Sequence, residues 1–160
     1  LSHEGRLAYI AIGVGRRSTS IVIVETDEMD RDMVTVSAEA LAAGLDAEGH
    51  VRVDGHHFAH GSATVRAESQ TAREALRDLL EARPDLSLYV VGHTDMSGTL
   101  SYNMNLSDRR AAAVVDALTT DYGIEAERLI AAGVGPLAPE ASNADETGRR
   151  HNRRVEIVAR

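Results

Sequence analysis

The sequence has no cysteine and no tryptophan, and its 160 residues include only one phenylalanine. Without cysteine, the chain can form no disulfide bond and offers no thiolate as a nucleophile or metal ligand. Because aromatic residues make up only 3% of the chain, the core must be built from alanine, valine, leucine and isoleucine. A hydrophobic share of 43% is enough for such a core, so the composition predicts a folded chain rather than a disordered one.

Basic residues are outnumbered as well. Seventeen lysines and arginines face 25 aspartates and glutamates, which gives a net charge of −8 at pH 7. Proteins that bind nucleic acid or an anionic membrane through bulk charge carry a basic surface, so we expect neither partner here. No apolar run approaches the ~18 residues that a membrane-spanning helix requires. The length fits one domain of ordinary size.

The first third of the chain predicts a β-hairpin followed by a short helix. Two β-branched runs, Leu7–Val14 and Ser20–Glu25, flank Gly15–Ser18, as in a hairpin. An acidic stretch follows and is interpreted as a solvated connector. Ser37–Leu45 begins with a capping serine and has apolar spacing, so it predicts a helix. We therefore treat residues 1–49 as an extension and residues 50–160, which start with a strand at His50–Val53, as the main domain.

The pattern is clearest from residue 67 onward. One helical face holds apolar residues at i, i+3, i+4, i+7 and i+8, and Pro84 ends the helix. These residues are Ala72, Ala75, Leu76, Leu79 and Leu80. Leu86–Val91 is apolar on both alternating sets, which predicts a strand covered on both faces.

A second helix, two more strands and a polar loop complete the pattern. The helix buries Ala111, Val114, Val115 and Leu118 and ends before Gly123. The strands are Arg128–Val134 and Arg153–Val158, and the loop between them spans Gly135–Asn152. The fold class is therefore α/β, an α+β sandwich. Its βαβ steps predict parallel pairing, with the last two strands antiparallel.

The sequence Gly92-His93-Thr94-Asp95 stands at the carboxyl end of the most apolar strand. Ligands of open α/β sheets bind beyond the carboxyl ends of the strands, so Asp95 is placed to meet a ligand. The alternative is a turn in which Asp95 accepts hydrogen bonds from nearby backbone amides. Position alone favours neither interpretation.

Arg110 lies four residues before Val114 and so begins on the core-facing side of its helix, whereas Arg109 projects toward solvent. An inward arginine needs a partner, because an unpaired buried charge is costly. Asp95 is the nearest candidate in the sequence. The pair either forms a structural ion pair or holds a ligand between its charges. A carboxylate beside a guanidinium matches an amino-acid zwitterion.

Arg153 and Arg154 open the last predicted strand. Strand alternation sends them to opposite faces, so one can reach the pocket and the other solvent. The histidine cluster His56, His57 and His60 matches no strong zinc template, and we expect no metal and no cofactor. The chain also lacks a phosphate-binding glycine loop and a nucleophile elbow.

Three stretches of the chain together resemble one known family. They are VVGHTDMSGTLSYNMNLSDRRAAAVVDAL, YGIEAERLIAAGVGPLAPEASN and TGRRHNRRVEIV. In order and spacing they resemble the OmpA-like C-terminal domain, which binds peptidoglycan in the periplasm of Gram-negative bacteria. The resemblance covers roughly His50 to Val158. It implies a βαβαββ fold with a mixed sheet and two main helices on one face, here preceded by the hairpin extension.

The resemblance also implies a ligand, the meso-diaminopimelate of the peptidoglycan stem peptide. Asp95 matches the aspartate that receives the ammonium, and Arg110 matches the arginine that receives the carboxylate. Asn103 and Arg153 match residues that face the pocket, and Thr94 matches the residue beside the ligand aspartate. The chain departs from the family at residue 59, where Ala59 follows Phe58 in place of an aspartate.

The resemblance implies a binding module rather than an enzyme. Such a module anchors an envelope protein, associated with the outer membrane, to the cell wall in the periplasm. Two alternatives remain. One is a zinc-dependent peptidoglycan hydrolase that uses the histidines, which would need three protein ligands and an open metal position. The other is an anchor for a stator or a sensor.

Overall fold

The computed structural model describes residues 2–3, 6–14, 19–26, 36–53 and 70–160. The chain divides into two compact units, Leu1–Thr35 and Val36–Arg160. Within the described part of the chain, no helix combines the length and the apolar character that crossing a membrane requires.

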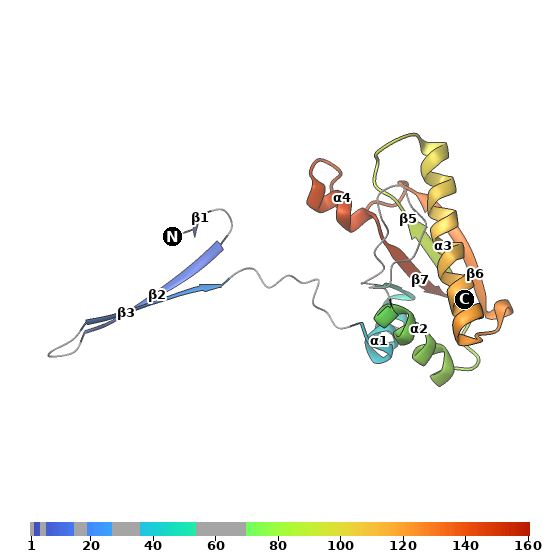
Figure 1. Ribbon diagram of the computed structural model, residues 1–160, viewed down its shortest axis with the longest axis horizontal. Helices are drawn as coiled ribbons and strands as arrows, with labels where there is room; N and C mark the ends of the chain where they lie inside the picture. Colours follow the sequence, from blue (N-terminus) through green and yellow to red (C-terminus); the bar gives the residue numbers. More distant parts are fainter. Residues whose placement is uncertain (1, 4–5, 15–18, 27–35, 54–69) are drawn as a thin grey trace. The chain divides into compact units, whose positions relative to one another are not determined.

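The first unit is a three-stranded antiparallel sheet in the order β1-β2-β3 (Figure 1). Its strands are β1 (Ser2–His3), β2 (Arg6–Val14) and β3 (Thr19–Thr26). β2 and β3 pair along their whole length, from Leu7↔Thr26 to Val14↔Thr19. The predicted hairpin is thus confirmed, while its Gly15–Ser18 connection and most of the acidic stretch lie outside the described residues.

The second unit contains a mixed sheet in the order β4-β7-β5-β6. β5 and β6 are parallel, and β7 is antiparallel to both β5 and β4. The predicted mixed sheet is confirmed. The elements are α1 (Ala38–Glu48), β4 (His50–Arg52), α2 (Gln70–Ala82), β5 (Leu88–His93), α3 (Leu100–Tyr122), η3 (Ala126–Arg128), β6 (Leu129–Gly135), α4 (Glu146–Asn152) and β7 (Val155–Ala159).

Local signals set the ends of α1 and α3. Ser37 Oγ accepts a hydrogen bond from the Ala40 amide at 3.2 Å, as the sequence predicts, and Thr99 caps α3 in the same way. Gly123 ends α3 with a φ of 69°, a left-handed conformation that glycine adopts without steric cost. The caps at Ser37 and Gly123 follow from residue type and make these two helix ends predictable, whereas the Thr99 cap was not predicted.

The core confirms the apolar face predicted for α2. All five of its predicted residues are buried, together with Leu88 and Val90 of β5 and Val114 and Leu118 of α3. Leu41 and Leu45 of α1 belong to the same core. Because α1 buries these two leucines in the second unit, that unit begins at Val36, and the predicted boundary between residues 49 and 50 falls inside it.

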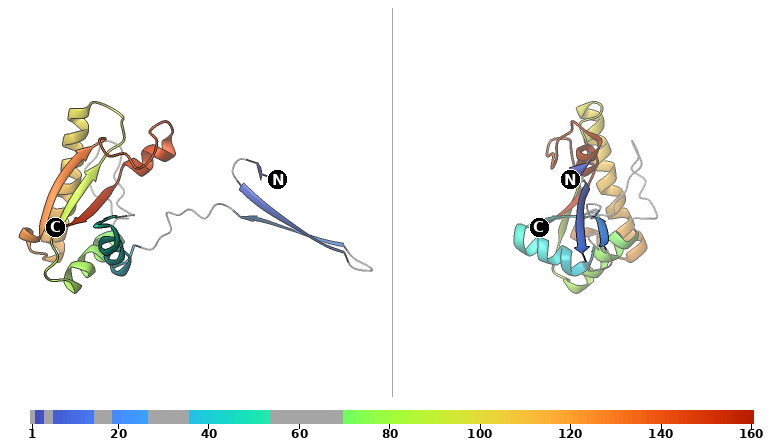
Figure 2. Two further views of the ribbon diagram at one scale, coloured as in Figure 1. Left: turned by 180° about the vertical axis from the view of Figure 1, so that it is seen from behind. Right: turned by 90° about the vertical axis from the view of Figure 1, so that its left-hand side faces the viewer.

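Two expectations are corrected. β5 is covered only in part on its second face: Leu88 and Val90 on the first face are buried, but Tyr89 on the second is 37% exposed, whereas His93 at the end of that face is buried. From behind, the strands lie in front of α3, which therefore covers one face of the sheet (Figure 2, left). An apolar strand face in the sequence does not reveal whether an element packs on it.

The second correction concerns the loop predicted at Gly135–Asn152, which contains the helix α4. Asp145 begins this helix by accepting a hydrogen bond from the Gly148 amide at 2.7 Å. The helix is short and carries arginines and a histidine, so it has no apolar periodicity that would have revealed it. Arg153 and Arg154 lie between α4 and β7 rather than within the last strand.

Candidate ligand-binding site

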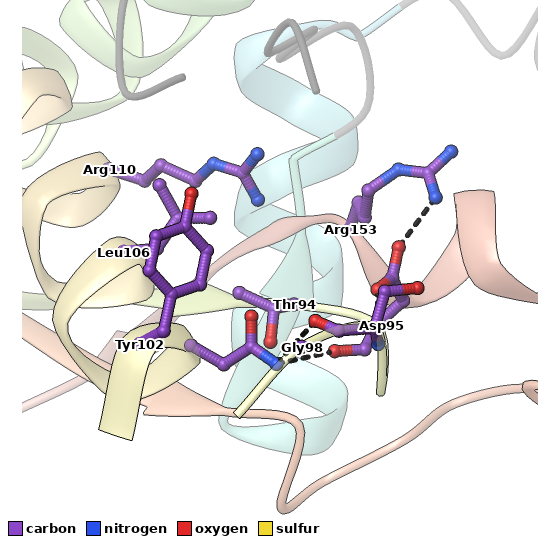
Figure 3. A pocket seen from close by; sticks show the side chains of 9 residues that line it. Thr94, Asp95, Gly98, Tyr102, Leu106, Arg110 and Arg153 are labelled. Atoms are coloured by element: carbon purple, nitrogen blue, oxygen red, sulfur yellow. Dashed lines mark hydrogen bonds and ion pairs between the residues drawn. The ribbon is translucent and has the colours of Figure 1, made fainter. Parts of the chain in front are cut away.

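A cavity of about 160 Å³ opens beyond the carboxyl end of β5. It lies between the loop that follows β5, the first turns of α3, and Arg153 at the end of α4 (Figure 3). Its lining consists of Thr94, Asp95, Ser97, Gly98, Tyr102, Asn103, Leu106, Arg110 and Arg153. The volume suits one small polar group rather than a drug-sized ligand.

Close packing of α3 on the sheet holds this cavity in place. A Cβ atom on Gly92 of β5 would collide with the Ser107 carbonyl, and one on Gly133 of β6 would collide with the Asp108 amide. Because both positions are glycine, the α3 backbone can approach the two parallel strands closely. This approach sets Asn103 and Arg110 beside the end of β5.

Asp95 is 4% exposed and makes two hydrogen bonds in the cavity. Its Oδ2 accepts from Arg153 at 2.6 Å, and its Oδ1 accepts from the Ser97 amide at 2.8 Å. Burial alone would raise the pKa of this carboxyl, but the bonds from Arg153 and Ser97 outweigh it and the pKa lies below its ordinary value. Asp95 is therefore a carboxylate at neutral pH.

Arg110 is 1% exposed and points into the cavity, as its helical phase predicts. It donates to the His93 carbonyl at 3.5 Å. Burial, together with the nearby charge of Arg153, lowers the pKa of Arg110 to about 10. It therefore stays charged at pH 7 and offers a desolvated cation to an anion. Arg109 is exposed on the outer side of α3.

Asn103 organises the loop that carries Asp95. Its Nδ2 donates to the Ser97 carbonyl at 2.9 Å and to the Asp95 carbonyl at 3.3 Å. Thr94 is 4% exposed, and its Oγ1 has no hydrogen-bond partner among the described residues. A buried hydroxyl of this kind can donate to a ligand.

The structure brings all five sequence-predicted site residues to one cavity, and it adds a partner that sequence distance did not suggest. The sequence named Asp95 as the nearest candidate partner for Arg110; in the structure Asp95 also pairs with Arg153, at 2.6 Å. Arg153 comes from the far end of the chain, so sequence distance could not suggest it. The Ser97 bond shows that Asp95 also accepts from a loop amide, so the turn interpretation and the pocket interpretation describe the same residue.

Residues 57–153 of the chain, more than half of its length, match the OmpA family. The chain belongs to the OmpA family. Over 99 residues it is 43% identical to outer membrane porin F of Pseudomonas aeruginosa; the match covers 62% of this chain and 28% of that protein. The chain spans at most about half the length of the first curated relatives it matches.

Two solved structures share the fold. The cell wall anchor of the T6SS from Pseudomonas aeruginosa has a TM-score of 0.59 at 34% identity, with 77% of this chain and 96% of that chain covered. The peptidoglycan-associated lipoprotein from Burkholderia pseudomallei has a TM-score of 0.61 at 29% identity, with 71% and 92% covered. The predicted α+β fold of an OmpA-like domain is thereby confirmed.

Sequence reasoning missed Tyr102, which lines this OmpA-family pocket, and Glu146, which lies outside the lining but contacts Arg153. Tyr102 is 47% exposed and its ring lies beside Arg110 in the lining (Figure 3). Glu146 does not line the cavity, but its Oε1 accepts from Arg153 at 2.6 Å. The signal for Glu146 was the acidic residue after the capping Asp145, which marks the first turn of a helix.

Within the described residues of this OmpA-family chain, the histidines take part in no candidate metal site. His56, His57 and His60 lie outside the described residues, as does the Phe58-Ala59 departure from the family pattern. His93 is buried away from the cavity lining, with Nε2 3.4 Å from Glu156 Oε2. Among the described residues, no group of three or more acidic or histidine side chains could hold a metal ion.

Proposed function

We propose that this chain binds peptidoglycan non-covalently through the meso-diaminopimelate of the stem peptide. The observation that carries the proposal is a buried carboxylate, Asp95, and a buried guanidinium, Arg110, in the lining of one small cavity. Charge-assisted hydrogen bonds to these groups complement a ligand with an ammonium and a carboxylate on the same carbon. The free end of diaminopimelate is such a group.

The lining favours binding over catalysis. Its hydroxyl groups are those of Thr94, Ser97 and Tyr102, and its cations are the two arginines. The arginines stay protonated, and the Asp95 carboxylate is held by Arg153 and the Ser97 amide with its pKa lowered, which makes both kinds of group poor general bases for activating these hydroxyls. Binding energy comes instead from charge pairing in a preformed site.

The names of the relatives support a role at the cell wall. One solved neighbour is described as a cell wall anchor and another as peptidoglycan-associated. In this proposal the chain lies in the periplasm and fixes an outer-membrane or other envelope protein to the wall. The chain spans only part of the length of the curated relatives. We therefore propose, rather than infer from those relatives, that the whole protein has this anchoring role.

Co-sedimentation with purified peptidoglycan tests the proposal. Wild-type protein should pellet with diaminopimelate-type wall and bind lysine-type wall about tenfold to a hundredfold more weakly, because lysine lacks the second carboxylate that Arg110 would bind. Free diaminopimelate should compete, and glycine should compete only at high concentration. Equal binding of the two wall types would show that the glycan or bulk charge is the ligand.

Two neighbouring arginines provide a matched pair of variants. Arg110→Met should lose the preference for diaminopimelate-type wall, because it removes the buried cation of the cavity. Arg109→Met makes the same change of charge on the exposed side of α3 and should bind as wild type does. Equal losses from the two variants would point to a diffuse basic surface and contradict the proposal.

A further inference from the structure

Asp95 lines the cavity, and one of its carboxylate oxygens already holds a cation that belongs to the protein. One terminal nitrogen of Arg153 lies 2.6 Å from Asp95 Oδ2, and the other lies 2.6 Å from Glu146 Oε1. A single guanidinium therefore joins a buried carboxylate to an exposed one: the Asp95 side chain is 6% exposed and the Glu146 side chain is 57% exposed.

A ligand ammonium that approaches Asp95 meets this arrangement directly. Asp95 Oδ1 already accepts the Ser97 amide and Oδ2 already accepts Arg153, so an incoming ammonium meets a carboxylate that holds another cation. Two cations on one carboxylate repel each other, and the repulsion is strong where water is scarce. Arg153 can leave at low cost, because it is 22% exposed and keeps its bond to Glu146. Arg110, which is almost fully buried, has no such freedom.

A third charge controls how strongly Glu146 holds Arg153. Arg149 Nε donates to Glu146 Oε2 at 2.9 Å, and its Nη1 donates to the Asn143 carbonyl at 3.0 Å. Arg149 and Arg153 thus share the carboxylate of Glu146, and together they hold its pKa below the ordinary value. A change at either Glu146 or Arg149 redistributes Arg153 between its two carboxylates.

We propose that Arg153 is an exchangeable internal cation on Asp95, and that Glu146 is a positioning residue that draws Arg153 aside when an ammonium-bearing ligand binds. The inference rests on the proposed function, because the ligand ammonium is the one that Asp95 receives there. Glu146 sets the affinity without touching the ligand. Its effect passes through Arg153.

Substitutions at Glu146 and at Arg149 should shift the affinity for the ligand in opposite directions. Glu146→Gln leaves Arg153 to Asp95 alone, so the dissociation constant for meso-diaminopimelate should rise about threefold. Arg149→Gln releases Glu146 to Arg153, so the constant should fall about twofold. These are the magnitudes of partly exposed ion pairs. Isothermal titration calorimetry at low salt measures both.

Asp46→Asn is the matched control. Asp46 pairs with Arg83 at 2.6 Å, is similarly exposed, and does not line the cavity. It changes the net charge as Glu146→Gln does, so it should leave the affinity unchanged. In an Arg153→Gln background, Glu146→Gln should have no effect, because the residue through which it acts is gone. A threefold loss that persists there would show a direct electrostatic effect and overturn the inference.

A second measurement needs no ligand. Carbon-detected NMR titration of the Asp95 carboxyl should show its pKa lowered by Glu146→Gln and raised by Arg149→Gln, with both shifts absent in the Arg153→Gln background. If wild-type protein binds no diaminopimelate, the proposed function fails while this titration still decides the inference. If wild-type protein binds and neither variant changes affinity or pKa, the proposed function stands and the inference fails.

Discussion

Arg153 and Arg154 are adjacent in the chain, yet they serve two different regions. Arg153 lies at the cavity, 22% exposed, between Asp95 and Glu146. Arg154 lies in a cluster away from the cavity lining, where its 6% exposed side chain donates to Glu156 at 2.7 Å and to the Ala138 carbonyl at 3.1 Å. Residue type and sequence neighbourhood are the same, so the difference comes from the partners that the fold supplies.

The cluster around Arg154 joins several elements. Glu156 of β7 also lies 3.4 Å from His93 of β5, and Glu140 lies 3.2 Å from Arg154 and 3.3 Å from Arg52 of β4. Three strands and the loop before α4 therefore share one set of charges. At the cavity, by contrast, the guanidinium of Arg153 contacts both a buried carboxylate, that of Asp95, and a solvated one, that of Glu146. We therefore expect the cluster to contribute mainly to stability and the cavity mainly to ligand binding.

Breaking the cluster should produce the largest effect on stability. Arg154→Met leaves the partly buried Glu156 without its closest cation and removes the contact of Arg154 with the Ala138 carbonyl, so we expect a loss of about 2–3 kcal/mol of unfolding free energy, at or below the low end for a buried pair. Urea denaturation measures this loss. Binding to diaminopimelate-type wall, assayed well below the melting temperature, should stay as in wild type. If the Arg154→Met protein folded but lost binding, the Arg154 cluster and the cavity would not have separate roles.

Removing the charge of Asp95 from the cavity should have the opposite effect: a large loss of binding and little loss of stability. Asp95→Asn should weaken binding about tenfold to a hundredfold, because the neutral amide cannot attract the ammonium. Stability should change little, since the new side chain can still accept from the Ser97 amide and Arg153 keeps Glu146. Parallel calorimetric binding and thermal melts separate the two. An unfolded Asp95→Asn protein would make Asp95 a structural residue like Glu156.

Acidification should also distinguish the Arg154 cluster from the cavity, through a smaller change in the free energy of unfolding. The His93 ring and Arg154 lower the pKa of Glu156 to about 2 from 4.5. Because the folded-state pKa is depressed, the stabilisation is fully present above pH 4.5 and is lost as the pH falls toward 2. Allowing for partial solvent exposure, we expect about 1–2 kcal/mol from this group.

Denaturation of wild type and Glu156→Gln between pH 5 and pH 2 measures that contribution. The wild-type protein should lose more free energy of unfolding over this range than the variant does. The comparison isolates Glu156 from Asp95, whose pKa is also lowered and which is unchanged in both proteins. If both proteins lost the same free energy of unfolding over this pH range, the charge of Glu156 would not be the source of its stabilisation.

Most of the fold could be predicted from local patterns. The face of α2, the capping Ser37, the terminal Gly123 and the paired strands of the hairpin each depend on residues close together in the chain. Helical phase alone also separated Arg110 from Arg109, because a step of one residue turns the side chain by about 100°. Family motifs added Thr94, Asn103 and Arg153, whereas Tyr102 of the lining was missed.

The sequence by itself determined which residues carry charge, which helix faces are apolar and where the helices are capped, because these depend on residue type and on spacing within a few turns. The tertiary structure decided which charges meet. Arg153 and Asp95 are 58 residues apart and pair only because the end of α4 comes to the carboxyl end of β5. The exposure of Tyr89 on the outer face of β5 and the position of Glu146 were decided in the same way, since both depend on which elements pack together rather than on local pattern.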